Sequence, residues 1–238
     1  MHRCSPTLLA LDTATEFCSV ALLRAGQVHV RAEHVGQRHS ERLLPMAQAL
    51  LADASVTLAD VDALAFGAGP GSFTGLRIAC GAAQGLAFGL DCPVLPVGNL
   101  RALAARVLVQ DTQARIIGVA IDARMNEIYW AAYQLDAGRL RELAPPALST
   151  PQACADELTN CGVNAIGGNA LSVPGTHWPQ AARRWAEARA DAGDIVRLAA
   201  EDWAAGRAVP AAEAAPLYVR DRVAQTIAER RMTAAQAS

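Results

Sequence analysis

A glycine-rich stretch at residues 67–89, GAGPGSFTGLRIACGAAQGLAFG, constrains the fold of this chain more than any other segment. It opens with a glycine–proline turn that the interior of a helix or strand would not tolerate. After Arg77 it continues as a run of small and apolar residues, and Ser72 or Thr74 is placed to cap a helix. The stretch therefore predicts a tight loop that leads directly into a helix.

Three glycines recur at every fourth position of that predicted helix, Gly81, Gly85 and Gly89, so they share one face. Each glycine costs a helix about 1 kcal/mol relative to alanine. Three on one face suggest a close contact that offsets this cost. Two interpretations remain open: the stripe packs on the sheet of its own domain, or it contacts another molecule. Arg77 and Gln84 argue against a membrane span.

The composition indicates a folded chain with a substantial core. The 238 residues suit one large or two small domains, and 52% of them are hydrophobic whereas 18% are charged. The net charge of −2 argues against a free-standing nucleic-acid binder. The six cysteines include no CxxC pair, which predicts reduced, buried thiols and not a disulfide framework or a zinc site. Asp12 and Glu16 interrupt the first apolar run, unlike a signal peptide, so a cytoplasmic location is expected.

The first half of the chain alternates predicted strands and helices. Strands are expected at residues 7–11, 19–24, 27–35, 63–66 and 93–97, and helices from His39 to about residue 54, through the glycine-rich stretch, and over 99–109 with Asn99 as a cap. Pro45 suits a first helical turn, so the helix after His39 either starts near Leu44 or bends there. The strand–helix–strand pattern around the glycine-rich stretch predicts a right-handed crossover between parallel strands.

The composition turns polar at residues 110–114, where we place a domain boundary. An N-terminal lobe is expected at 1–110, a C-terminal lobe at 111–220, and a helix or tail at 221–238. In the second lobe we expect a hairpin of strands 115–122 and 127–135, a turn and helix over 145–158, a strand at 164–169, helices at 183–189 and 194–205, and a helix or frayed tail at 220–231.

Two polar clusters are candidate ligand sites. Asp12 and Thr13 end a predicted strand, where they can contribute to a phosphate cradle or only cap a turn. Asp122, Arg124 and Glu127 gather near another strand end, where a ligand site and a surface ion network are both open. The glycine pair at residues 167–168 allows a ligand or a backbone to come close.

Histidine and serine give weak signals for catalysis. His39 is a candidate metal ligand, but Leu43 stands at the i+4 position where a helical metal pair needs its second ligand. We therefore expect no metal site. A hydrolase would need a nucleophile elbow of the G-x-S-x-G form, to which Gly71, Ser72 and Phe73 are the nearest approach.

Five segments resemble the bacterial TsaB family, also called YeaZ, in order and spacing: LALDTATEFCSVAL, HSERLLPM, GAGPGSFTGLRIACGAAQGLAFGL, DARMNEIYWAAY and PLYVRD. The resemblance spans nearly the whole chain. It implies a two-lobed α/β fold of the actin, hexokinase and Hsp70 ATPase type, with mixed sheets flanked by helices. It also implies a non-catalytic role in forming N6-threonylcarbamoyladenosine in tRNAs that read codons beginning with adenine.

The same resemblance implies partners and the surface that meets them. TsaB proteins pair with and activate the catalytic subunit TsaD, TsaE joins the pair, and tRNA is met only through the complex. The isolated chain is expected to form a homodimer. The implied partner interface lies on the two helices that begin at His39 and in the glycine-rich stretch, and it comprises His39, Ser40, Leu43, Leu44, Met46, Ala47, Arg77, Gly81, Gly85 and Gly89.

The resemblance also bears on cofactors. The catalytic relative has a metal-binding HxxxH where this chain has His39 and Leu43. Folds of this type clamp phosphate with a second glycine-rich loop, and residues 122–125 lack glycine there. We expect no tightly bound cofactor and only weak ATP or ADP binding in the complex, through Asp12 and Thr13. The alternatives are a stand-alone peptidase-like hydrolase and a sugar or acetate kinase, and the missing loop argues against the kinase.

Overall fold

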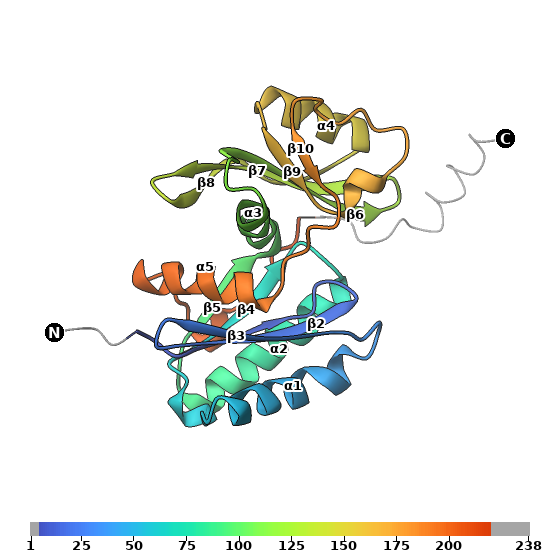
Figure 1. Cartoon of the computed structure of the whole chain (residues 1–238). Helices are drawn as coiled ribbons and strands as arrows, with labels where there is room; N and C mark the ends of the chain where they lie inside the picture. The colour runs from blue at the N-terminus through green and yellow to red at the C-terminus, as the bar shows by residue number, and fades with distance from the viewer. Residues whose placement is uncertain (1–4, 220–238) are drawn as a thin grey trace.

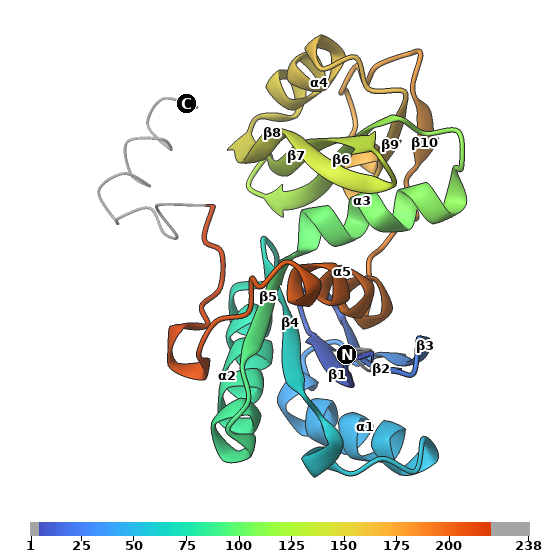
Figure 2. The same cartoon turned by 90° about the vertical axis from the view of Figure 1, so that its left-hand side faces the viewer.

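The computed structural model describes residues 5–219, which form two stacked α/β halves (Figures 1 and 2). The elements of the first half are β1 (Leu8–Asp12), β2 (Phe17–Arg24), β3 (Gln27–His34), α1 (His39–Asp53), η1 (Leu58–Asp60), β4 (Ala63–Gly69), α2 (Phe73–Leu90), β5 (Val94–Gly98) and α3 (Asn99–Gln110). Those of the second half are β6 (Ile116–Arg124), β7 (Glu127–Asp136), β8 (Arg139–Ser149), α4 (Pro151–Asn160), β9 (Ala165–Gly167), η2 (Asn169–Ser172), β10 (Arg183–Trp185), α5 (Ala192–Ala204) and η3 (Ala211–Glu213).

The two sheets repeat one topology. The first has the strand order β3-β2-β1-β4-β5, and the second, read from its other edge, has the order β8-β7-β6-β9-β10. In each sheet the first three strands in sequence are antiparallel neighbours, and the fourth and fifth join in parallel. The parallel pairing of β4 and β5 around α2 is the predicted crossover.

The last helix of each half packs on the sheet of the other half. Helix α3 lies against β6, β7 and β9, and α5 lies against β1 to β5, so the two helices meet between the sheets (Figure 1). Leu100 and Val107 of α3 are buried with Ile117 of the second sheet, whereas Ile195 of α5 is buried with Leu8 of the first. Apolar faces, not chain order, decide this exchange.

The predicted division at residue 110 stays a prediction, but the chain crosses it in both directions. Residues 99–110 pack mainly on the second sheet, and the chain from α5 onward returns to the first. Val209 forms an antiparallel bridge with Val94, and the Leu217 amide donates to the Ala68 carbonyl at 2.6 Å. The part of the predicted tail at 220–231 lies outside the described residues.

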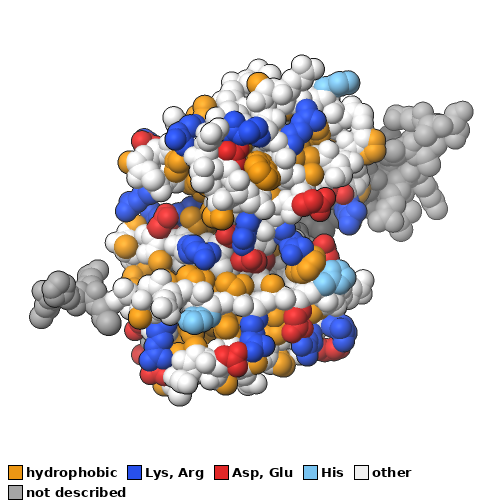
Figure 3. Space-filling model, viewed as in Figure 1, with side chains coloured by type: hydrophobic (Ala, Val, Ile, Leu, Met, Phe, Trp, Pro, Cys, Tyr) orange, Lys and Arg blue, Asp and Glu red, His pale blue; other side chains and the backbone are white. Residues whose placement is uncertain are grey.

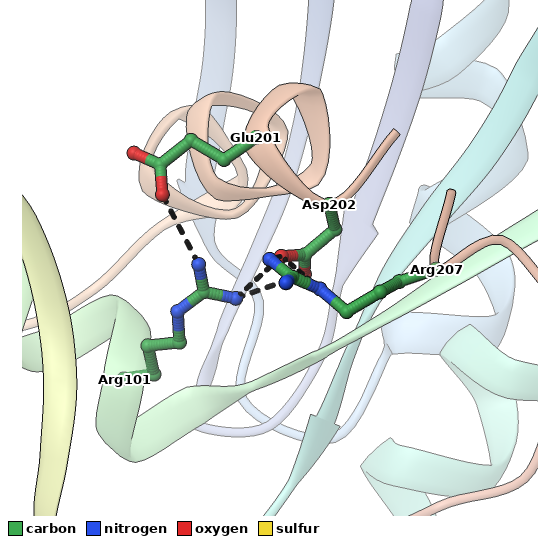
Figure 4. A network of polar contacts seen from close by, with 4 residues as sticks. All are labelled: Arg101, Glu201, Asp202 and Arg207. Carbon is green, nitrogen blue, oxygen red and sulfur yellow. Dashed lines mark hydrogen bonds and ion pairs between the residues drawn. The ribbon is translucent and has the colours of Figure 1, made fainter. Parts of the chain in front are cut away.

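Ion pairs join α3 to α5 where they cross. The Arg101 guanidinium donates to both carboxylate oxygens of Asp202 at 2.8 and 2.9 Å and to Glu201 at 3.2 Å, and Arg207 also contacts Asp202 (Figure 4). One turn and a half along α3, Arg106 donates to Asp191 at 2.6 Å and to Asp194 at 2.9 Å. Because each half contributes one helix, these pairs connect the two halves.

Helices α1 and α2 cover the other face of the first sheet. Their apolar side chains share a core with the sheet that includes Leu9, Leu11, Leu43, Leu64 and Phe66. Each such side chain contributes about 1.5–3 kcal/mol through burial. The Ser72 hydroxyl caps α2 by accepting from the Gly75 amide at 3.3 Å, as one of the two predicted caps.

Two local predictions were wrong. Residues 139–149 form β8, where a turn was expected near Pro145, because an edge strand can accommodate prolines that lack an amide donor. Residues 183–185 form the short strand β10, not a helix, because they complete the second sheet beside β9. Helix α1 begins at His39, as predicted, and contains Pro45 within its second turn, which excludes the alternative start near Leu44.

Two further expectations meet the described residues. The five cysteines among them are free thiols, and Cys18, Cys80 and Cys154 are buried, as predicted. Among the described residues, no helix has the length and apolarity needed to cross a bilayer.

Candidate functional site

The close backbone approach that the glycines suggest occurs at the loop before α2. A Cβ atom at Gly75 would lie 1.9 Å from the Thr13 carbonyl oxygen, and one at Gly67 would lie 2.2 Å from the Asp12 carboxylate. The Thr13 hydroxyl donates to the Gly75 carbonyl at 2.6 Å. Glycine at these two positions therefore lets the β1 end and the start of α2 touch.

A buried polar centre lies at the end of β1. The Asp12 Oδ1 atom accepts from Asn99 Nδ2 at 3.0 Å and from the Ala14 amide at 3.3 Å, and Asn99 Oδ1 accepts from the Gly69 amide at 2.6 Å. Burial raises the pKa of Asp12 from 3.8 to about 6, although the hydrogen bond from Asn99 opposes this rise. Protein groups thus engage Asp12 and Thr13, in keeping with the turn-capping interpretation, and their contact with a nucleotide stays a prediction.

A cleft of about 560 Å³ separates the two halves beside this centre. One wall comes from the first half, at residues 14–16 and 70–73, and the other comes from residues 121–124, Tyr129 and Asn169 of the second half. An adjoining cavity of about 150 Å³ extends from the cleft to Asp12 and Asn99. Charges of both signs are interspersed over the face that Figure 3 displays.

The turn between β6 and β7 forms part of the second wall. The Arg124 amide donates to Asp122 Oδ1 at 2.7 Å, and the Arg124 guanidinium lies 3.4 Å from the other carboxylate oxygen with 86% of its side chain exposed. Glu127 lies opposite Arg124 in the register of β6 and β7. The predicted cluster of Asp122, Arg124 and Glu127 therefore gathers at one strand end, where Arg124 and Asp122 form an ion pair, and a ligand role for the cluster stays a prediction.

The glycine pair at the end of β9 allows two backbone segments to come close together. Gly168 has a φ of 120°, and a Cβ atom there would lie 2.1 Å from the Ala120 carbonyl oxygen. The neighbouring Asn169 side chain accepts from the Asp122 amide at 2.9 Å, so this turn supports the second wall of the cleft.

The glycine stripe of α2 faces outward. Gly81, Gly85 and Gly89 are exposed, and a Cβ atom at any of them would meet nothing within 4 Å. The interpretation in which the stripe packs on the domain's own sheet is therefore wrong. Arg77 lies on the same face, and Ser40 and Leu44 are exposed on α1. The contact of these six residues with a partner stays a prediction.

Four residues of the implied partner interface are buried in the chain itself. Leu43, Met46 and Ala47 belong to the core under the first sheet, and the His39 ring hydrogen bonds to the Thr15 carbonyl at 2.7 Å. Helical spacing places all four on the inner face of α1. Buried side chains offer little surface to a partner, and the contact of these four residues with one stays a prediction.

Sequence reasoning missed the role of Asn99 and the grouping of Phe73, Arg77 and Tyr218. Asn99 was expected only as a helix cap, whereas its side chain links β1 to β4. Tyr218 lies in PLYVRD, which carried the resemblance but suggested no site. The sequence offered one signal for Asn99. Its side-chain amide directly follows β5, a strand that runs parallel to β1, which ends at Asp12.

Two repeats of one sheet topology, a cleft between them and exchanged final helices define a two-lobed fold of the actin, hexokinase and Hsp70 ATPase type, as predicted. A family model described as "TsaD: tRNA N6-adenosine threonylcarbamoyltransferase" matches residues 28–172. Relatives that are 36–40% identical over 91% of the chain show that it belongs to the TsaB family, also called YeaZ.

The relatives that establish the family match along almost all of the chain. The tRNA threonylcarbamoyladenosine biosynthesis protein TsaB of Haemophilus influenzae is 40% identical over 91% of this chain and 94% of that protein, and TsaB of Escherichia coli is 36% identical over 91% and 96%. The solved structure of YeaZ from Pseudomonas aeruginosa has a TM-score of 0.80 at 42% identity, covering 90% of this chain and 99% of that one.

Proposed function

We infer that this chain takes part in the formation of N6-threonylcarbamoyladenosine in tRNA, the process named for its TsaB relatives. Within that process we propose that it is a non-catalytic subunit that pairs with TsaD and holds it in an active arrangement. TsaE joins the pair, and tRNA is bound through the complex, in the cytoplasm. The observation that carries the pairing proposal is the outward-facing glycine stripe on α2.

The stripe supports pairing because its glycines destabilise the helix and no described residue packs on them. The three glycines weaken an exposed helix by about 1 kcal/mol each relative to alanine, and no described side chain packs on them. A smooth stripe lets a second helix come close and gain dispersion along its length. Phe88 is 85% exposed at the same end of α2, and large exposed apolar side chains often mark interfaces. The same face accounts for a homodimer of the isolated chain.

The absence of independent catalysis is supported by the candidate side chains. Ser72, the nearest approach to a nucleophile elbow, caps α2, and His39 Nε2 is bonded to a backbone carbonyl. Within residues 5–219, no group of three or more His, Cys, Asp or Glu side chains is arranged to hold a metal. These observations favour an accessory role over a peptidase-like hydrolase.

Nucleotide binding is proposed to be weak and confined to the complex. Asp12 and Thr13 already bond to protein groups. On the other wall, the turn of Arg124, Met125 and Asn126 stands where a glycine-rich phosphate loop would be needed, and this argues against a sugar or acetate kinase.

The decisive experiment combines co-purification with TsaD of the same cell and a tRNA modification assay in which each subunit is omitted in turn. We expect a stable pair, and modification only when both chains are present. Modification by TsaD without this chain would contradict the proposal, as would modification by this chain alone.

A Gly85→Leu variant tests the proposed face. The leucine would separate the two backbones and abolish pairing with TsaD, while the monomer stays folded because the added side chain meets only solvent. Ala153→Leu, at an exposed position of α4, is the matched control and should pair normally. Pairing by Gly85→Leu with parental affinity would place the partner elsewhere.

A further inference from the structure

Three segments that are distant in the sequence meet at the mouth of the cleft. They are the start of α2, the turn after β6 and the chain that follows η3, and they include parts of the GPGSFTGLR, DARMNEIY and PLYVRD motifs. Phe73 and Tyr218 line the mouth with 42% and 48% of their surfaces exposed. The function proposed above leaves this convergence unexplained.

Phe73, Arg77 and Tyr218 form what we call the mouth cluster. The Arg77 guanidinium carbon lies 3.5 Å from the centre of the Phe73 ring and 5.6 Å from that of Tyr218, and the two ring centres are 6.1 Å apart. Arg77 forms no ion pair with any residue between 5 and 219. Aromatic rings therefore orient its guanidinium, and no carboxylate of residues 5–219 compensates its charge.

The position of Tyr218 is fixed by the first half of the chain. The Leu217 amide donates to the Ala68 carbonyl at 2.6 Å, and Gln84 Nε2 donates to the Ala214 carbonyl at 2.8 Å. Gly69 leaves room for this segment, because a Cβ atom there would lie 2.8 Å from the Leu217 carbonyl oxygen. These contacts hold the Tyr218 side chain beside the start of α2.

The opposite side of the mouth adds a second cation. Arg124 projects from the turn between β6 and β7, where the residues 124–126 have φ values of 65°, 56° and 58°. Two acids also line the cleft, Glu16 and Asp122, and one Asp122 oxygen accepts from the Arg124 amide.

We propose that the mouth cluster binds an unpaired nucleotide of the tRNA substrate. The base stacks on the Arg77 guanidinium and the Tyr218 ring, and the phosphates lie between Arg77 and Arg124. Unpaired RNA bases are recognised by stacking on aromatic rings and guanidinium planes, with cations on the backbone. Phe73, Arg124 and Tyr218 line the cleft, and Arg77 packs on Phe73 at its edge. The cleft volume of about 560 Å³ lies within the range of about 300–1,000 Å³ that is typical of ligand pockets. The proposal rests on the function inferred above.

The test measures binding of a labelled, unmodified anticodon stem-loop RNA to the complex of the full-length chain with TsaD at low ionic strength, with the pairing of each variant checked by co-purification. A fully paired hairpin of the same length and free ATP are the comparison ligands. Tyr218→Ala and Arg77→Ala remove members of the mouth cluster. Leu143→Ala and Arg139→Ala, both exposed on β8 and away from the cleft, are the matched controls.

We expect Tyr218→Ala and Arg77→Ala each to weaken stem-loop binding by about 5- to 100-fold, the range of a lost base stack. The controls should bind as the parent does, and the paired hairpin should bind more weakly. Equal affinity of Tyr218→Ala and Leu143→Ala would overturn the proposal. So would loss of binding confined to a full-length variant with Arg220, Arg222, Arg230 and Arg231 changed to glutamine.

Two more outcomes are decisive. If ATP displaces the stem-loop as effectively as unlabelled stem-loop RNA does, the site binds free nucleotide and the RNA proposal fails. If the mouth variants bind RNA normally while omission of the chain still stops tRNA modification, the inferred function stands and only this site is wrong.

Discussion

The two halves of this protein repeat one turn with different surroundings. Asp12 ends β1 and Asp122 lies near the end of β6, and each carboxylate accepts from the amide two residues later, at Ala14 and Arg124. In the first half Asn99 and the Gly67 loop close over the carboxylate. In the second half the Asp122 side chain is 28% exposed at the cleft.

The difference shows that a repeated topology does not repeat its chemistry. The first half has α1 and α2 on one face of its sheet and α5 on the other, so its turn is buried and its carboxylate is desolvated. In the second half the matching turn presents Arg124 to solvent. One half therefore provides the rigid packing, and the other provides an exposed wall of the cleft.

The largest expected effect comes from filling the space between β1 and α2. Gly75→Ala should lower the free energy of unfolding by more than about 3 kcal/mol, because its methyl group would collide with the Thr13 carbonyl, which belongs to the backbone and cannot rotate away. Chemical denaturation measures the change. A loss below about 1 kcal/mol would show that the first half is less tightly packed than described.

The buried carboxylate should give stability an unusual pH dependence. Because the folded state raises the pKa of Asp12 to about 6, it keeps a proton that the unfolded chain releases near pH 4. The contribution of Asp12 to the free energy of unfolding therefore falls by up to about 3 kcal/mol as the pH rises from about 4 to 6, and it is constant above pH 6. Burial likewise raises the pKa of Asp194 to about 6, so both groups lower the stability over the same pH range.

The Asp12→Asn variant separates the contribution of Asp12 from that of Asp194. The amide keeps the size of the side chain and cannot ionise, so the variant should gain stability relative to the parent as pH rises from 4 to 6. Denaturant unfolding at several pH values checks this, and Asp122→Asn at the equivalent turn is the matched control. A constant difference between Asp12→Asn and the parent across the window would refute the assignment.

The ion pairs between the exchanged helices should contribute an intermediate effect. Asp202→Ala leaves the partly buried Arg101 without its carboxylate and should cost about 2 kcal/mol, as charged hydrogen bonds do. Arg141→Ala breaks an exposed pair with Asp136 inside one hairpin and should cost less than about 0.5 kcal/mol. Equal losses in thermal or chemical unfolding would mean that the link between the halves adds nothing beyond a surface pair.

The smallest expected effect lies on the outer face of α2. Gly85→Ala should raise the free energy of unfolding of the monomer by about 0.5–1 kcal/mol, because alanine favours the helix and its methyl group meets nothing within 4 Å. Set beside Gly75→Ala on the same helix, it contrasts the packed and the free face. Destabilisation by Gly85→Ala would show that the stripe has an internal contact.

Local patterns predicted most elements because each depends on neighbours in the sequence. The hairpin of β2 and β3, the helix after Ser72 and the α2 crossover follow from periodicity, turn residues and a cap. Strand β8 was missed because its prolines argue against a strand, and only its edge position in the sheet permits them. The short β10 carries too few residues for a period to be visible.

The sequence by itself determined the family, the two-lobed fold and the helix with its stripe of glycines. Only the tertiary structure decided which glycines are packed and which are free, because spacing along a helix assigns residues to a face but does not say what that face meets. Gly75 touches the Thr13 backbone, whereas Gly85 meets solvent. In the same way, α3 and α5 exchange halves because their apolar faces fit the opposite sheets, a match between surfaces that are distant in the chain.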